Sequence, residues 1–182
     1  MEPEPLIKSA SNRSLKSAFE EPYLGNVHEC FVEALEHYSR YSGAAKLYMK
    51  SISVVQSSGM GKSRMVDEAT NMIFTIPANL REDLPVGETT YPPPDTALRS
   101  HFVDHEKKSN ELLQAECAIL LKHIFATVTS KLPSVLAKES GLTLAVAWAN
   151  HLKSQSTTEK VGGEREAFYS QALDAAQKVG ML

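Results

Sequence analysis

The sequence predicts an α/β fold in which a small parallel sheet carries a phosphate-binding loop and adjoins a large helical part. Three consecutive features predict it. The apolar, β-branched run 52–55 is typical of a buried strand. The run 56–63 reads Gln-Ser-Ser-Gly-Met-Gly-Lys-Ser, and it follows the pattern G-x-x-x-x-G-K-[ST] except that Gln56 replaces the first Gly. An amphipathic run over 64–73 then predicts a helix. This order of elements aims backbone N–H groups at a phosphate.

Each residue type in this loop has a role in binding a nucleotide. Gly59 and Gly61 lack a Cβ atom, so the backbone can wrap closely around an anion. Lys62 would reach the β- and γ-phosphates, and the Ser63 hydroxyl would bind Mg²⁺. The sequence therefore predicts binding of ATP or GTP with Mg²⁺. The predicted nucleotide-binding residues are Ser57, Ser58, Gly59, Met60, Gly61, Lys62, Ser63 and Arg64.

A second interpretation of the same residues stays open. Gln tolerates a positive φ poorly, so Gln56 fits the loop only as the last residue of the strand. The alternative is a Ser/Gly turn that leads into a helix N-terminus and binds nothing.

The loop and the residues after it resemble a known family. The segments are Val54–Arg64, Val66-Asp67-Glu68, Phe74–Arg81 (Phe-Thr-Ile-Pro-Ala-Asn-Leu-Arg) and Tyr91–Asp95 (Tyr-Pro-Pro-Pro-Asp). Together they resemble an uncharacterised family of P-loop NTPase-like proteins of mushroom-forming fungi, related to the NTPase regions of crinkler-type effector proteins. The resemblance covers about residues 50–100. It implies a P-loop fold and purine-nucleotide binding, and it implies no particular substrate.

Hydrolysis needs an acid that the sequence does not display. A P-loop NTPase holds Mg²⁺ through an Asp at the end of a second apolar strand. The apolar runs 74–76, 118–121 and 142–149 are followed by Pro77, Lys122 and Asn150. The catalytic residues are therefore unknown, and we expect little or no hydrolysis by this chain alone. Two accounts fit: an N-terminal piece of a longer protein, or a complete short protein that has kept the loop and lost turnover.

Composition restricts the class of protein. The net charge of −3 over 182 residues argues against general nucleic-acid binding. Cys30 and Cys117 are far apart and suggest neither a disulfide framework nor a zinc site. Neither a signal peptide nor an apolar run of 18 residues is visible, so we expect an intracellular, cytoplasmic protein without a membrane span.

The chain divides into a flexible segment, 1–25, and one domain, 26–182. Within the domain we expect a leading helix over 26–50, a β-loop-α-β core over 51–81, a Pro-rich loop over 82–95 and a mainly helical region over 96–182. Asp95 is the expected N-cap of a helix that starts near Thr96. Pro133 is expected to end or restart a helix, and 142–149 is a candidate third strand.

Two further predictions, a metal site at His101 and His105 and a phosphate contact of Arg81, each leave two interpretations open. His101 and His105 have metal-ligand spacing on a helical pattern, but they lack a third ligand and also suit a solvated helix face. Arg81 follows the second predicted strand, where it could contact phosphate or lie in solvent.

An incomplete sheet would leave apolar surface uncovered, which promotes association. We therefore expect self-association or a protein partner, with Leu112, Leu120, Leu121, Ile124 and Trp148 among the residues that cover the core. The competing functional class is a helical interaction module, or an effector-like module, whose degenerate loop binds no nucleotide.

Overall fold

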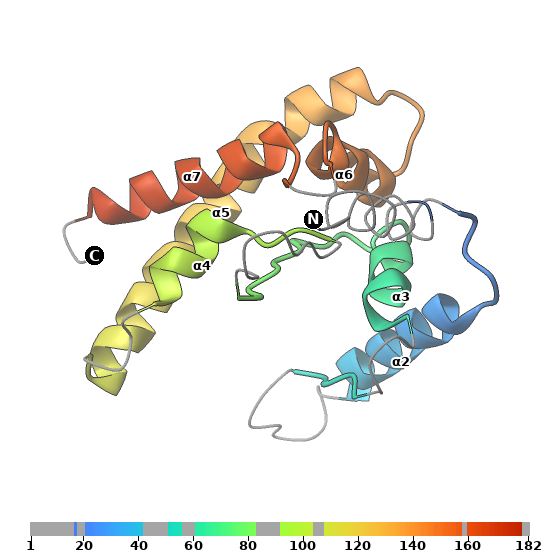
Figure 1. Ribbon diagram of the computed structural model, residues 1–182, viewed down its shortest axis with the longest axis horizontal. Helices are drawn as coiled ribbons and strands as arrows, with labels where there is room; N and C mark the ends of the chain where they lie inside the picture. The colour runs from blue at the N-terminus through green and yellow to red at the C-terminus, as the bar shows by residue number, and fades with distance from the viewer. Residues whose placement is uncertain are drawn as a thin grey trace, which may run out of the picture.

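The computed structural model describes residues 17, 21–41, 51–55, 61–82, 92–103, 108–157 and 160–179. Within these ranges the chain is helical (Figure 1). The helices are α2 (Val27–Tyr41), α3 (Lys62–Ala69), α4 (Thr96–Phe102), α5 (Asn110–Lys138), α6 (Leu144–Lys153) and α7 (Gly163–Gln177).

The core lies where α4, α5, α6 and α7 meet. Trp148, Phe168 and Tyr169 are each at most 2% exposed, and Leu98 of α4 and Leu120 of α5 join the same cluster. The ring of Trp148 meets that of Phe168 edge-on, with centroids 5.5 Å apart. Buried aromatic rings contribute large apolar areas, so this cluster is the main source of stability.

Hydroxyl caps begin two of the core helices. The Ser109 side chain accepts a hydrogen bond from the Leu112 N–H at the start of α5, and that of Thr143 accepts one from the Val146 N–H at the start of α6. Each cap satisfies a backbone donor that the first turn leaves without a partner. Helix α5 ends at Lys138, and Gly141 in the link to α6 takes φ 91°, a conformation that favours glycine.

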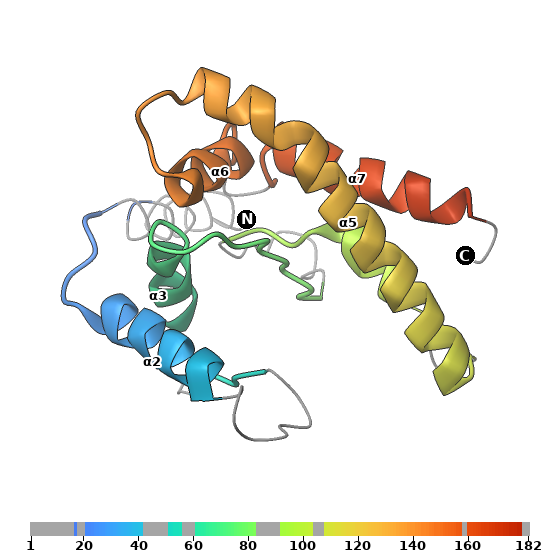
Figure 2. The same ribbon diagram turned by 180° about the vertical axis from the view of Figure 1, so that it is seen from behind.

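Helices α2 and α3 pack against each other and lie to one side of the core in both views (Figures 1 and 2). Val32 of α2 and Met65 of α3 are each 5% exposed. The link to the core includes an ion pair of 2.9 Å between Asp67 of α3 and Lys153 of α6.

The predicted α/β fold is wrong for this structure, because none of the described residues forms a strand. The segments 52–55 and 74–76 are non-helical, but neither pairs with a neighbouring strand. A strand is stable only when its backbone N–H and C=O groups find a partner chain, and apolar composition by itself does not supply one. The small parallel sheet and the β-loop-α-β core are therefore absent from the part of the chain described.

The third strand proposed over 142–149 is instead the start of α6. Thr143 caps the helix, and Ala145, Trp148, Ala149 and Leu152 are buried at helical spacing. Pro133 also lies inside α5 and does not end it. Proline removes one N–H donor, and the burial of Val128 and Val135 on either side holds the helix together.

Another sequence prediction is confirmed. A helix does begin at Thr96, immediately after Asp95. Of the predicted leading helix over 26–50, the structure describes α2 over Val27–Tyr41, and residues 42–50 lie outside the described residues. Among the described helices α5 has the length and composition of a membrane span. This is weak evidence, because core helices pass the same test and α5 packs against α6 and α7.

Candidate phosphate-binding site

The candidate site is the N-terminus of α3, where the predicted loop meets its helix. Gly61 adopts φ 77° and ψ 15°, and α3 starts at the next residue. A Cβ atom at Gly61 would meet nothing within 4 Å, so backbone conformation alone, and not space, favours glycine here. Gly61 is the N-cap residue of α3, and it has no side chain that could bond the backbone N–H groups of the first turn.

The first turn of α3 is rich in donors and lacks acids. It carries Lys62, Ser63 and Arg64 and no carboxylate. Lys62 is half-buried and Ser63 is exposed. A helix N-terminus carries a partial positive charge, which favours an anion at this position.

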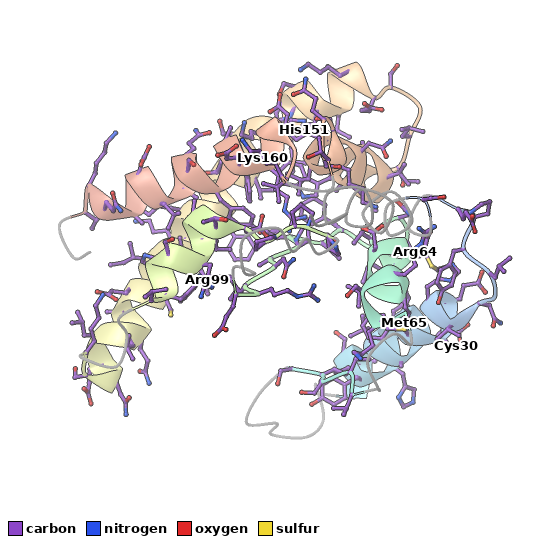
Figure 3. All side chains as sticks on the ribbon, viewed as in Figure 1. Cys30, Arg64, Met65, Arg99, His151 and Lys160 are labelled. Carbon is purple, nitrogen blue, oxygen red and sulfur yellow. The ribbon has the colours of Figure 1, made fainter. Side chains whose placement is uncertain are left out.

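Arg64, labelled on α3 in Figure 3, is paired with a carboxylate. Its Nε donates to Glu68 Oε1 at 3.0 Å along the same helix, and its Nη2 donates to the backbone carbonyl of Glu21. The side chain therefore lies against its own helix and the segment that precedes α2. Of the predicted nucleotide-binding residues, Gly61, Lys62, Ser63 and Arg64 are brought together at this helix start. Ser57, Ser58, Gly59 and Met60 lie outside the described residues, as does Gln56.

Three carboxylates that follow the loop in the sequence are each engaged in an ion pair. Asp67 pairs with Lys153, Glu68 with Arg64, and Asp95 with Arg165. A catalytic carboxylate must be available to hold Mg²⁺ or to orient water. These three acids do not meet that need in this arrangement. Asp104 lies outside the described residues.

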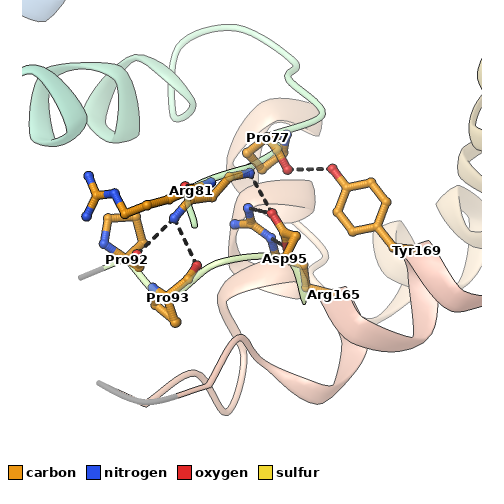
Figure 4. Close-up of polar contacts among 8 residues, drawn as sticks. Pro77, Arg81, Pro92, Pro93, Asp95, Arg165 and Tyr169 are labelled. Carbon is orange, nitrogen blue, oxygen red and sulfur yellow. Dashed lines mark hydrogen bonds and ion pairs between the residues drawn. The ribbon is translucent and has the colours of Figure 1, made fainter. Parts of the chain in front are cut away.

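Hydrogen bonds join Asn79 to the segment 92–95, which lies on the other side of the Pro-rich loop in the sequence (Figure 4). The Asn79 amide Nδ2 donates to the carbonyls of Pro92 and Pro93 at 2.9 and 3.0 Å. The Asn79 N–H donates to Asp95 Oδ2 at 2.7 Å, and the Asp95 N–H donates to the Asn79 carbonyl at 2.9 Å. These bonds fix the base of the Pro-rich loop.

Arg165 of α7 completes this polar cluster. Its Nε and Nη2 donate to the two Asp95 carboxylate oxygens at 2.7 and 2.6 Å, and Asp95 is only 3% exposed. Asp95 thus occupies the predicted N-cap position, but its side chain caps no helix N–H and binds Asn79 and Arg165 instead. No motif in the sequence marks Arg165, so only the fold could reveal this pair.

Tyr169 lies beside the same cluster and donates its hydroxyl hydrogen to the Pro77 carbonyl. Burial raises the pKa of Tyr169 well above its usual range, and the nearby Asp95 carboxylate raises it further. Tyr169 is therefore a structural donor and not a proton carrier near neutral pH.

The structure describes two of the three other candidate site residues, Arg81 and His101, but not His105. Arg81 is exposed at the end of the 74–82 segment. His101 lies on α4 in contact with Phe102, and His105 is outside the described residues. Where the chain is described, no group of three His, Cys, Asp or Glu side chains is placed to hold a metal ion. Mg²⁺ bound to a nucleotide needs few protein ligands, and the exposed Ser63 hydroxyl fits that limited role.

Comparisons with known protein families, with curated proteins and with solved structures found no match.

Proposed function

We propose that this chain binds a purine nucleoside triphosphate, ATP or GTP, as its Mg²⁺ complex through residues 57–64. The observation that carries the proposal is Gly61 in the left-handed conformation, followed directly by a helix whose first turn holds Lys62 and Ser63 and no acid. Backbone N–H groups, a helix N-terminus and a lysine are the donors that phosphates prefer. A cytoplasmic location, which we also propose, would supply both nucleotide and Mg²⁺.

The proposal is restricted to binding. Efficient phosphoryl transfer depends on positioning and charge stabilisation by an available acid and a metal. Asp67, Glu68 and Asp95 are each paired with a cation, so we expect turnover near background. Steady phosphate release on the order of 1 s⁻¹ that Lys62→Ala abolishes would contradict this restriction.

Calorimetric titration tests the binding. We expect weak binding of Mg²⁺-ATP or Mg²⁺-GTP, and a loss of roughly 10- to 100-fold in affinity for Lys62→Ala, as for removal of a charge-assisted hydrogen bond. Lys178→Ala, beyond the end of α7, is the matched control and should bind like the wild type. Absence of heat with folded protein at millimolar nucleotide, or equal affinity in both variants, would overturn the proposal.

A second candidate function is protein interaction, and the surface around α5 favours it. Leu121 and Phe125 are 52% and 58% exposed, whereas the predicted covering residues Leu120, Ile124 and Trp148 are buried. Leu112 is 41% exposed.

Sedimentation over a range of concentrations distinguishes self-association from a monomer. Nucleotide binding that survives Leu121→Ser and Phe125→Ser would show that the two functions are separate.

A further inference from the structure

A cavity lies between the start of α4 and the start of α7, and none of its lining residues belongs to α3. Its volume is about 330 Å³, which is near the lower end of the range for small-molecule sites, ~300–1,000 Å³. The lining combines charged side chains with apolar ones: Asp95, Lys160 and Glu166 with Pro94, Leu98 and Val161. A cavity of this size and composition suits a ligand no larger than a small metabolite.

Two opposite charges on the walls of this cavity do not meet. Asp95 is paired with Arg165. Within the part of the chain that the structure describes, the side chains of Lys160 and Glu166 form no ion pair with one another or with a third residue. Both side chains are exposed, so a ligand can reach them from solvent. A molecule that carries both charges can form a charge-assisted hydrogen bond with each of them.

The loop that presents Lys160 is held in place at both ends (Figure 3). The Lys160 N–H donates to Thr157 Oγ1 at 3.1 Å, and the Thr157 N–H donates to the Lys160 carbonyl at 3.0 Å. A Cβ atom at Gly162 would clash with the Ser154 carbonyl oxygen, so only glycine lets the loop pass this close to the end of α6. The Glu166 N–H then donates to the Gly162 carbonyl in the first turn of α7. Binding groups that are fixed beforehand lose little entropy when a ligand binds.

The opposite wall is held by the Asp95 cluster (Figure 4). Both carboxylate oxygens of Asp95 accept from Arg165, and the Tyr169 hydroxyl donates to the Pro77 carbonyl. These groups are already bonded, so they give the cavity its shape and leave the ligand to other residues. Thr96 follows Asp95, and its exposed side chain adds a hydroxyl to the lining.

We propose that the cavity between α4 and α7 binds a free α-amino acid with an apolar side chain. The Glu166 carboxylate accepts from the ammonium group, Lys160 donates to the carboxylate, and the apolar side chain lies against Leu98 and Val161. Amino acids are the common small metabolites that carry both charges and an apolar group. A ligand with only one charge leaves either Lys160 or Glu166 without a partner and therefore binds more weakly. The proposal is independent of nucleotide binding, since it uses no residue of α3.

L-Leucine is the probe, and nuclear magnetic resonance titration of the isotope-labelled full chain is the measurement. We expect millimolar leucine to shift the amide signals of Thr96, Val161 and Glu166 and to leave those of α2 unchanged. Isocaproate lacks the ammonium group of leucine, isoamylamine lacks its carboxylate, and glycine lacks its side chain. Each of the three should bind at least about tenfold more weakly, because each loses one of the proposed contacts.

Substitutions assign the two charges. Lys160→Met and Glu166→Gln should each weaken leucine binding at least about tenfold. Glu166→Gln should leave isocaproate binding unchanged, because that ligand has no ammonium group. The matched controls are Lys178→Met, beyond the end of α7, and Glu29→Gln, exposed on α2, which should bind leucine like the wild type.

Three results would overturn the proposal. The first is the absence of shifts at the cavity amides when the spectrum is that of a folded protein. The second is binding of isocaproate or isoamylamine as tight as that of leucine, which would show that the cavity does not recognise both charges. The third is leucine binding that neither Lys160→Met nor Glu166→Gln weakens. Glycine binding as tight as that of leucine would overturn the contact of an apolar side chain with Leu98 and Val161.

Discussion

At the scale of single residues, a nearly buried ion pair joins Asp95 to Arg165 across 70 positions of sequence. Both side chains are nearly buried, at 2% and 12% exposure. A buried ion pair is stabilising only when each charge is fully bonded. Here both carboxylate oxygens accept from the guanidinium, and Oδ2 also accepts from the Asn79 N–H.

We expect Arg165→Leu to lower the free energy of unfolding by about 3–5 kcal/mol, because it leaves the Asp95 carboxylate buried without its cation. Arg165→Lys should recover part of the loss, since lysine restores the charge but not the two-pronged geometry. The matched control is Arg40→Leu, which breaks the exposed Arg40–Glu36 pair and should cost under about 1 kcal/mol. Urea unfolding measures all three, and equal costs at Arg165 and Arg40 would refute the structural role of the cluster.

At the scale of elements, His151 lies where α6 meets α7. Its ring lies against Trp148 with centroids 5.7 Å apart, and its Nε2 lies 3.5 Å from Glu164 Oε2 of α7. Burial lowers the pKa of His151 below 6.5; Glu164 and Glu139 oppose this, while Lys131 and Lys138 of α5 reinforce it. The unfolded chain therefore binds a proton at a higher pH than the folded one does.

This difference makes stability depend on pH in a defined direction. As the pH falls through 6.5, the unfolded state gains a proton before the folded state, so the free energy of unfolding decreases. Below the folded-state pKa both states are protonated and the loss levels off. We expect His151→Gln to reduce the decline between pH 7 and pH 5, as measured by urea unfolding at each pH. An unchanged slope in the variant would assign the dependence to other groups.

At the scale of the whole molecule, stability is unevenly distributed. The cluster of α4–α7 contains the largest buried side chains, whereas Val32 is the buried apolar residue of α2. Regions with few buried contacts open locally at lower free energy than the core. The α2–α3 pair, which carries the candidate phosphate site, therefore belongs to the less stable part of the described structure.

Hydrogen exchange should show this difference directly. We expect the amides of α2 to exchange faster than those of α5 and α7, and Val32→Ala to accelerate α2 while global stability changes little. Phe168→Ala should instead lower the free energy of unfolding by about 3–5 kcal/mol, because it leaves a cavity in the centre of the core. Uniform acceleration by both substitutions would indicate one cooperative unit.

Sequence patterns determined the features that depend on neighbouring residues. The start of α4 after Asp95 follows from local backbone preferences, which a few residues encode. The left-handed Gly61 at the start of α3 follows for the same reason, so half of the predicted loop could be placed at a helix N-terminus. The use of that site by a nucleotide remains a prediction.

Tertiary structure decided that the apolar runs 52–55 and 74–76 did not become strands and which of the three acids Asp67, Glu68 and Asp95 was paired with which cation. The segments 52–55 and 74–76 have strand composition, but a strand also needs a neighbour for its backbone, and no run of the described chain supplies one. The run 142–149 became helix because Thr143 caps it and its alanines pack against α5 and α7. Asp95 was predicted to cap a helix, but its carboxylate accepts a hydrogen bond from Arg165, 70 residues away in the sequence. Composition is local, whereas hydrogen-bond partners and burial come from distant parts of the chain.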